Sequence, residues 1–312
     1  MSATQTTVLL HSRKLSQTSI STSSLPPAYE PGDYIELDNL STTSSRSSSS
    51  PPQYNDGYYL SAQGSSSSSS SSRPTPTFHC TKALQIEARG HPLLAFPHSP
   101  RRTPIPIYNV DLSTGIATDL AYQSLRPIRG SGNSNLIRAG DSENDPICRT
   151  TYRFGPGKPP KLELCGLMAY EEEFEVVNKG FTTRAQVFRT HLGTFQWRYA
   201  GREERKAAGA DNLMVLDRIV KVALEGGKQD EKRIPVARLV RNAEVRSKET
   251  KITTAGNGGR LMMNLMEWEG TKGDAEQMEV LVVASCLVML KKEVDRRRVH
   301  QAIAMTSPCY LA

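Results

Sequence analysis

The sequence predicts a mainly β protein: a closed antiparallel β-barrel of about 10–12 strands that encloses a C-terminal apolar α-helix, preceded by a disordered tail. From residue 78 onward, short stretches of alternating apolar and polar side chains recur between Pro, Gly and Asn/Asp turns. Near the C-terminus, Val280–Leu290 contains no charge, and Ser285 is its only polar side chain. A helix without a polar face must be buried on every side. A closed barrel supplies that interior and also removes sheet edges.

We expect the C-terminal helix to cover about residues 274–299. Asp274 is the expected N-cap, with Gln277 three residues on and acidic side chains in the first turns. At roughly 1.5 Å per residue, the uncharged run reaches about 16 Å, half of a ~30 Å hydrocarbon core. The sequence therefore predicts no transmembrane span. The valines leave a buried strand as the alternative, but the length of the run and its flanks favour a helix.

The strand-like stretches are short and closely spaced. In Thr194–Tyr199, the side chains of Phe195, Trp197 and Tyr199 alternate with polar ones. The other expected strands are Ala83–Ala88, Ile105–Val110, Ile116–Leu120, Cys148–Phe154, Leu162–Leu164, Glu173–Val177, Arg184–Leu192, Leu213–Leu224, Ile234–Val240 and Gly258–Trp268. Arg202–Ala208 is expected to form a short exposed helix or turn. No long amphipathic helices alternate with the strands, which disfavours a doubly wound α/β fold.

The first 77 residues differ in composition from the rest. They are low-complexity sequence rich in Ser, Thr and Pro, with serine runs at Ser47–Ser50 and Ser65–Ser72. Burial of so few apolar side chains cannot offset the conformational entropy lost on folding, and we therefore expect residues 1–77 to be disordered. We expect residues 78–305 to form the barrel domain and residues 306–312 to form a short tail. The first 77 residues carry four basic and five acidic side chains, so the net charge of +7 resides wholly in the folded part. This excess is compatible with anionic partners or with a solvated face.

The N-terminal tail contains two copies of the PPxY pattern, at Pro26–Tyr29 and Pro51–Tyr54. These copies resemble the ligands of WW domains, including those of HECT-type ubiquitin ligases. Consecutive prolines favour a polyproline II conformation that docks into an aromatic groove, and the tyrosine supplies an anchor. Chance occurrence in a Pro/Ser-rich tail is the alternative interpretation. The predicted WW-binding residues are Pro26, Pro27, Tyr29, Pro51, Pro52 and Tyr54.

A family resemblance lies in the terminal EVLVVASCLVMLKKEVDRRR of Glu279–Arg298, the GTFQWRY of Gly193–Tyr199 and the strands before them. Together they resemble the tubby C-terminal-like superfamily, which includes tubby, the LURP-one-related proteins and the phospholipid scramblases. The resemblance covers roughly Phe78 to Met305 and implies a barrel around the helix. The layout is also similar to fungal proteins in which a Ser/Pro-rich tail precedes such a domain. No phosphoinositide-contacting residue of tubby can be matched, and the Cys-rich cluster and acidic loop of scramblases are missing.

No catalytic, metal or cofactor site is predicted. The histidines lack metal-ligand spacing, the five cysteines form no CxxC pair, and no serine lies in a nucleophile elbow. The glycine-rich Ala255–Arg260 lacks the Lys-Ser/Thr of a phosphate-binding loop, so we interpret it as a loop or hairpin turn. Cys286 lies in the apolar helix and is expected to be a buried thiol. The cysteine pattern favours a reducing compartment, hence a cytoplasmic location, with membrane-peripheral or nuclear as alternatives.

The function expected from the sequence is a non-enzymatic binding or adaptor protein. Its barrel would recognise a membrane surface or a protein partner, and its PPxY tail would recruit a WW-domain protein. The candidate contacts to an anionic phospholipid are Lys291, Lys292, Arg296, Arg297 and Arg298. Charge at a helix C-terminus is the alternative account of this cluster. Nucleic-acid binding is disfavoured because no recognition signature accompanies the charge. The alternative function is a lipid-handling protein of scramblase type, in which the apolar helix would enter the bilayer.

Overall fold

The computed structural model describes residues 78–93, 103–128, 131–153, 158–166, 172–180, 183–223, 229–270 and 273–306. The predicted disordered tail of residues 1–77, with both PPxY copies, lies outside the described residues. Of the predicted C-terminal tail, Thr306 is the last residue of a helix and residues 307–312 are not described.

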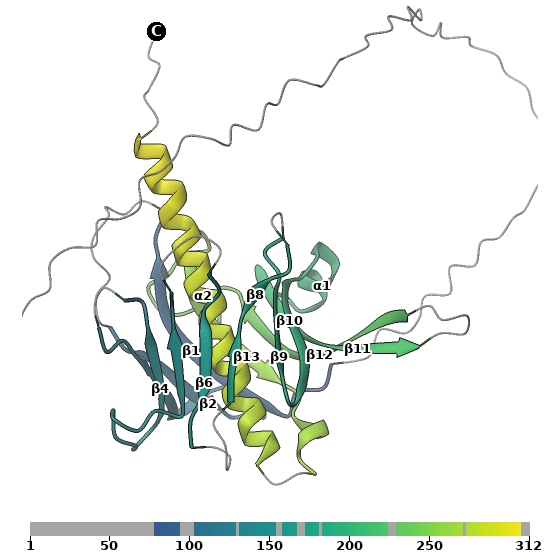
Figure 1. Ribbon diagram of the computed structural model, residues 1–312. Helices are drawn as coiled ribbons and strands as arrows, with labels where there is room; N and C mark the ends of the chain where they lie inside the picture. The colour runs from purple at the N-terminus through teal and green to yellow at the C-terminus, as the bar shows by residue number, and fades with distance from the viewer. Residues whose placement is uncertain are drawn as a thin grey trace, which may run out of the picture. The chain divides into compact units, whose positions relative to one another are not determined.

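The described residues form a single antiparallel sheet of 13 strands around a long helix (Figure 1). The strands are β1 (Lys82–His91), β2 (Ile105–Val110), β3 (Ala117–Leu125), β4 (Ser134–Arg138), β5 (Cys148–Thr151), β6 (Lys161–Leu164), β7 (Glu172–Glu175), β8 (Val177–Asn178), β9 (Gln186–Thr190), β10 (Gly193–Tyr199), β11 (Asn212–Ala223), β12 (Gln229–Arg241) and β13 (Ala255–Met263). The helices are α1 (Arg202–Ala207), the 3-10 turn η1 (Met266–Trp268) and α2 (Asp274–Thr306). This confirms the mainly β class, with 13 strands instead of 10–12. The two strands that the sequence pattern missed are β4 and β8.

The order of the strands brings the two ends of the sheet together. It runs from β7 through β1, then from β13 back to β8, so that β1 pairs with β13 and β7 and β8 lie at opposite ends. Only Val176 separates β7 from β8 in the chain, and consecutive Cα atoms are about 3.8 Å apart. Since one residue cannot bridge an open gap, the sheet must curl until its edges meet. Val176 is fully buried at this point.

Side chains complete the seam between β7 and β9. One oxygen of Glu172 accepts a hydrogen bond from the backbone N–H of His191 at 2.8 Å, and the other lies 2.8 Å from the His191 ring Nδ1. The ring of Phe174 stacks on Phe188 with centroids 5.5 Å apart. The strand order includes no ladder between β7 and either β8 or β9 among the described residues. The barrel is therefore nearly closed, with its seam held by side chains instead of backbone ladder bonds.

The helix α2 passes through this barrel and leaves it at one end (Figure 1). Every residue from Gln277 to Leu290 is buried except Leu287, which is half-buried. The enclosed apolar helix is confirmed, and it continues beyond the predicted end at residue 299 to Thr306. Asp274, expected as the N-cap, is the first helical residue instead, and the N–H of Gln277 donates to the carbonyl of the preceding Gly273 at 2.9 Å.

Two polar side chains in the buried part of α2, those of Glu279 and Ser285, have hydrogen-bond partners in the sheet. Near the entry, Glu279 accepts a hydrogen bond from the Tyr122 hydroxyl at 2.8 Å and pairs with the Lys82 amine at 2.7 Å. In the middle, the hydroxyl of Ser285 accepts from the indole N–H of Trp197 at 2.9 Å. Buried polar groups without partners would cost roughly 1–3 kcal/mol each. These contacts therefore fix both the depth and the rotation of the helix in the barrel.

The glycine-rich stretch 255–260 is a strand and not the expected loop, so that prediction was wrong. It forms most of β13, which pairs with β1 and β12 and packs against α2. A Cβ on Gly256 would lie 2.5 Å from the carbonyl oxygen of Leu290, and one on Gly258 would lie 1.9 Å from that of Ile86. The glycines are needed because backbone approaches backbone here. The expected strand Gly258–Trp268 likewise ends at Met263 and is followed by η1.

Replacing Gly256 by alanine should therefore destabilise the protein. The new Cβ would meet Leu290 and Val294, and alanine would have to adopt the positive φ of 68°. We expect a loss of about 2–4 kcal/mol in the free energy of unfolding, measured by chemical denaturation. Gly270→Ala is the matched control, since no atom lies within 4 Å of its added Cβ. It should change stability by less than about 1 kcal/mol. Equal effects of the two substitutions would contradict the close packing of α2 on β13.

Candidate anion-binding site

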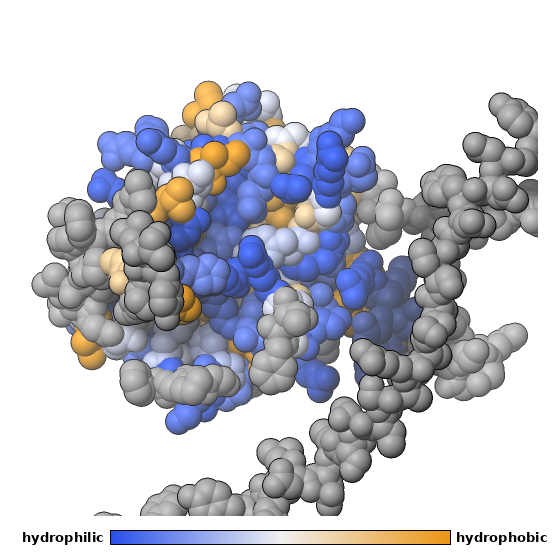
Figure 2. Space-filling model, turned by 90° about the horizontal axis from the view of Figure 1, so that it is seen from above, coloured by the Kyte–Doolittle hydropathy of each residue, from blue (hydrophilic) through white to orange (hydrophobic). Residues whose placement is uncertain are grey.

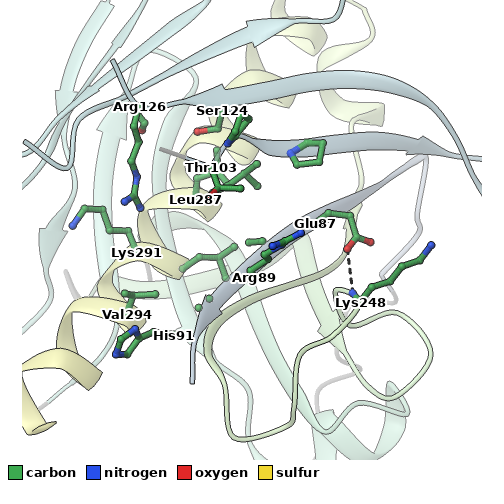
Figure 3. Close-up of a pocket in the computed structure, with 18 of the residues that line it drawn as sticks. Glu87, Arg89, His91, Thr103, Ser124, Arg126, Lys248, Leu287, Lys291 and Val294 are labelled. Carbon is green, nitrogen blue, oxygen red and sulfur yellow. Dashed lines mark hydrogen bonds between the residues drawn. The ribbon is translucent and has the colours of Figure 1, made fainter. Parts of the chain in front are cut away.

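A large cleft opens beside α2 where the helix leaves the barrel (Figure 3). Its volume is about 1090 Å³, and it lies between the last residues of β1, the start of β2, the end of β3 and the Leu287–Arg298 part of α2. Ligand pockets in proteins typically measure about 300–1,000 Å³. The cleft is therefore large enough for a ligand the size of a lipid headgroup with part of its chains.

The floor of the cleft is apolar. Leu287, Leu290 and Val294 contribute to it from α2, and Ile105 contributes from β2. The three helix residues are spaced by three and four positions, so they lie on one face of the helix. Leu287, the one incompletely buried residue in the enclosed run, faces this cleft. The sheet thus leaves a small part of the apolar run, at Leu287, incompletely covered.

The walls of the cleft are predominantly cationic. Five positively charged side chains line it: Arg89, Arg126, Lys248, Lys291 and Arg298. The two carboxylates in the lining are Glu87 and Glu249. In Figure 3, Arg126 and Lys291 lie on the same side of the cleft, one from the end of β3 and one from α2, and Arg89 projects from β1. The chain segments that supply these cations are far apart in sequence, so only the fold brings them together.

The cations differ in how firmly they are held. Lys291 forms an ion pair with Asp295 one turn further along α2 at 2.5 Å, and its amine lies 4.4 Å from the centre of the Tyr152 ring. In contrast, Arg89, Arg126 and Arg298 form no ion pair within the part of the chain that the structure describes. Unpaired guanidinium groups around a low-dielectric floor create a positive potential that attracts anions. The free cations are thus the groups available to a ligand.

The structure divides the five basic residues predicted as anion contacts among three places. Lys291 and Arg298 line the cleft, since residues seven apart share a helix face. Arg296 and Arg297 line a second, smaller pocket of about 230 Å³. The amine of Lys292 lies between side-chain oxygens of Gln186 and Asn178.

Burial, with the nearby charge of Arg296, lowers the pKa of Lys292 to about 8. Lys292 thus occupies a partly buried polar site on β8 and β9 and not the wall of the cleft. Sequence reasoning missed Arg89 and Arg126, because a single arginine at a strand end carries no signal of what it will face.

A buried ion pair fixes the helix at its exit. Both terminal nitrogens of Arg241, which is 3% exposed, contact the carboxylate of Glu293 at 2.7 and 2.8 Å. The Tyr199 hydroxyl donates to the same carboxylate at 2.6 Å and the Gly256 N–H at 2.9 Å. Burial alone would raise the pKa of Glu293, but the hydrogen bonds and charge of Arg241, with Tyr199 and Gly256, hold that pKa below its ordinary value. The carboxylate is therefore ionised in the folded protein.

Glu293→Gln should leave the buried Arg241 without its counter-ion and cost roughly 3–5 kcal/mol of unfolding free energy at neutral pH. Because the pKa of Glu293 is lowered on folding, its contribution is complete well above the ordinary value of 4.5. It is lost as pH falls through that value toward the folded-state pKa. The stability difference between wild type and Glu293→Gln should therefore shrink on acidification, as measured by denaturation at several pH values.

Glu175→Gln is the control for this experiment, since Glu175 pairs with Arg153 in a solvent-exposed position. It should cost less than about 1 kcal/mol. A loss no larger for Glu293→Gln than for Glu175→Gln would contradict the anchoring role of the buried pair.

Within the described ranges, no group of three or more His, Cys, Asp or Glu side chains could hold a metal ion. The four cysteines in these ranges are free thiols, and burial raises the pKa of Cys286 to about 12, as expected for a buried thiol. No helix of the described part has the length and apolar character needed to cross a membrane. No protein-family model, curated protein or solved structure matches this chain, so the superfamily expected from the sequence stays a prediction.

Proposed function

We propose that this protein is a non-enzymatic binding protein of tubby-like architecture that attaches peripherally to anionic membranes and recruits WW-domain proteins through its tail. The observation that carries the membrane half is the cleft beside α2, in which unpaired arginines surround an apolar floor. The barrel around a C-terminal helix supports the tubby-like assignment, since that arrangement is what the resemblance implies.

The composition of the cleft favours an amphiphilic anion over a simple salt or an apolar ligand. Arg89 and Arg126 can form charge-assisted, bidentate hydrogen bonds to phosphate oxygens. Leu287, Leu290 and Val294 offer apolar contact to a neighbouring glycerol or acyl segment. A phosphorylated lipid headgroup combines both chemistries. Viewed from the end at which α2 leaves the barrel, most of the visible described surface is hydrophilic, with a few apolar residues between (Figure 2).

A peripheral contact fits the protein better than insertion of α2 into the bilayer. The helix carries the carboxylate of Glu279 in its buried part and that of Glu293 at its exit from the barrel, and each accepts a hydrogen bond from the sheet. Withdrawing the helix into hydrocarbon would separate these groups from Tyr122 and Tyr199, and a charge in the bilayer core is costly. Apart from the half-buried Leu287, the apolar side chains of Val280–Leu290 are already buried inside the barrel. The cleft and the cations that line it would therefore contact the membrane, with the protein on the cytoplasmic side of the bilayer.

The tail supplies the second half of the proposed function. Its two PPxY copies are 25 residues apart, counted from Tyr29 to Tyr54. Two linked ligands can engage tandem WW domains, so that the second contact forms at high effective concentration. HECT-type ubiquitin ligases carry WW domains of this kind. The protein would then act as an adaptor that brings such a partner to a membrane surface.

The membrane half is tested by sedimentation with liposomes. Wild type should sediment with phosphatidylcholine vesicles that contain a phosphoinositide and not with phosphatidylcholine alone. Arg89→Gln/Arg126→Gln should bind about 30-fold more weakly, at about 1 kcal/mol per lost cation near the surface. The control Lys221→Gln/Lys232→Gln removes the same charge from exposed positions on β11 and β12, outside the cleft lining. If both double variants lose binding equally, or wild type ignores the phosphoinositide, the cleft is not the lipid site.

The tail half is tested by calorimetry with a tandem WW-domain protein. Tyr29→Ala/Tyr54→Ala should abolish binding, because the anchoring ring of each copy is lost. Each single substitution should leave one weaker site and remove the avidity, a loss of roughly 10²-fold. Tyr58→Ala/Tyr59→Ala is the matched control, since these tyrosines follow no PPx sequence. Unchanged binding by Tyr29→Ala/Tyr54→Ala would reject the recruitment of WW domains.

A further inference from the structure

The smaller pocket, of about 230 Å³, lies on the Arg296–Arg297 part of α2. Its other walls come from Tyr199 at the end of β10, the residues at the start of β11, Arg241 at the end of β12 and the Ile252–Thr254 segment before β13. The residues that line it are different from those of the large cleft. Among the described residues that line this pocket, Ile252 is the only large aliphatic side chain, so they provide no apolar floor.

The pocket carries a strong excess of positive charge. Of the residues that the structure describes, five arginines and two carboxylates, Asp211 and Glu293, line it. The arginines are Arg184, Arg241, Arg246, Arg296 and Arg297. Like charges at this density repel one another unless an anion lies between them. The excess of three cations is therefore the first indication of a ligand.

The two carboxylates are already committed. Glu293 holds both terminal nitrogens of Arg241, and Asp211 pairs with Arg246 at 2.6 Å. Arg184, Arg296 and Arg297 form no ion pair with any residue that the structure describes. Arg297 donates one hydrogen bond, from Nη2 to the carbonyl of Thr253 at 3.1 Å, which directs its guanidinium toward the Thr253 wall.

Two guanidinium nitrogens of the lining are buried without a hydrogen-bond partner. They are Nη1 of Arg297 and Nε of Arg241, and Arg241 is itself only 3% exposed. Buried donors in native proteins are almost always satisfied, and a charged donor left unpaired is especially costly. Protein atoms cover these two nitrogens, so a bound anion would act on the two guanidinium groups through charge and not through a hydrogen bond to the covered nitrogens.

We propose that this pocket binds a phosphate monoester as the dianion, at a site separate from the lipid cleft. A phosphate group offers two negative charges and three acceptor oxygens, which match the paired nitrogens of arginine. A volume of 230 Å³ corresponds to about eight waters at roughly 30 Å³ each. It therefore accommodates the phosphate and a small polar group attached to it, and it excludes an acyl chain. The ester comes either from a soluble metabolite or from a phosphorylated headgroup that reaches the pocket from a membrane.

The first experiment measures thermal stability and calorimetric binding of the full chain with inorganic phosphate and with glycerol 2-phosphate. Sodium chloride at the same ionic strength is the reference. A ligand that binds only the folded state raises the melting temperature, and the rise grows with the logarithm of the ligand concentration above its Kd. We expect stabilisation by phosphate and by the ester beyond that of chloride. The proposal would be overturned if phosphate and the ester stabilise the protein no more than chloride does and Arg296→Gln/Arg297→Gln also sediments with phosphoinositide vesicles as wild type does.

The variant Arg296→Gln/Arg297→Gln locates the site. It should weaken phosphate binding at least tenfold, because two of the three unpaired cations are lost. Lys221→Gln/Lys232→Gln removes the same charge elsewhere and should bind phosphate as wild type does. Circular dichroism and the melting temperature without ligand show that both variants fold. Retention of phosphate binding by folded Arg296→Gln/Arg297→Gln would overturn the proposal.

A second comparison separates this site from the proposed lipid cleft and identifies the source of the ester. Arg89→Gln/Arg126→Gln should lose liposome binding and keep the calorimetric signal with glycerol 2-phosphate, which would assign the pocket to a soluble ester. If Arg296→Gln/Arg297→Gln weakens sedimentation with phosphoinositide vesicles and the soluble ester does not bind, the phosphate belongs to a lipid headgroup. Loss of ester binding in the cleft variant and retention in the pocket variant would place the phosphate in the cleft and overturn the proposal.

Discussion

A helix without a polar face is the constraint on which the rest of this structure depends. Val280–Leu290 can be stable in water only if protein covers every side of it, and a sheet does so only when it curls round and its edges meet. The single residue between β7 and β8 enforces that curling through the chain itself. The glycines of β13 then allow the sheet to approach the helix backbone. Fold, closure and glycine content are thus consequences of one apolar segment.

The same constraint positions the candidate sites. The sheet covers α2 as far as Leu290, and the Arg241–Glu293 pair fixes the helix where that cover ends. Beyond this point the helix presents cations on several faces, because side chains are distributed around it at 3.6 residues per turn. One face adds Lys291 and Arg298 to the wide cleft with its apolar floor, and another adds Arg296 and Arg297 to the small polar pocket. Basic residues that are close together in sequence therefore line two different sites, the wide cleft and the small polar pocket.

The sequence predicts the elements whose patterns are local. The buried helix, the β10 alternation and β2 follow from periodicity and are confirmed, and α1 follows from its composition. The Ser134–Arg138 strand was missed, because five residues without clear alternation resemble a loop. The start of β13 was wrongly predicted as a loop, because the need for glycine in close packing depends on which backbone lies opposite. The site was predictable only in part. Lys291 and Arg298 lie on a helix whose period is known, whereas Arg89 and Arg126 meet them only through the long-range order of the strands.

Hydrogen exchange of the α2 backbone amides tests the enclosure of the helix most directly. Amides of the enclosed run Val280–Leu290 should exchange only by global unfolding, so that their protection matches the free energy measured by denaturation. Amides of Val299–Thr306, where the helix extends beyond the barrel, should exchange much faster. Exchange in Val280–Leu290 as rapid as in Val299–Thr306 would contradict the account, since the helix would then be exposed and the barrel would not be built around it.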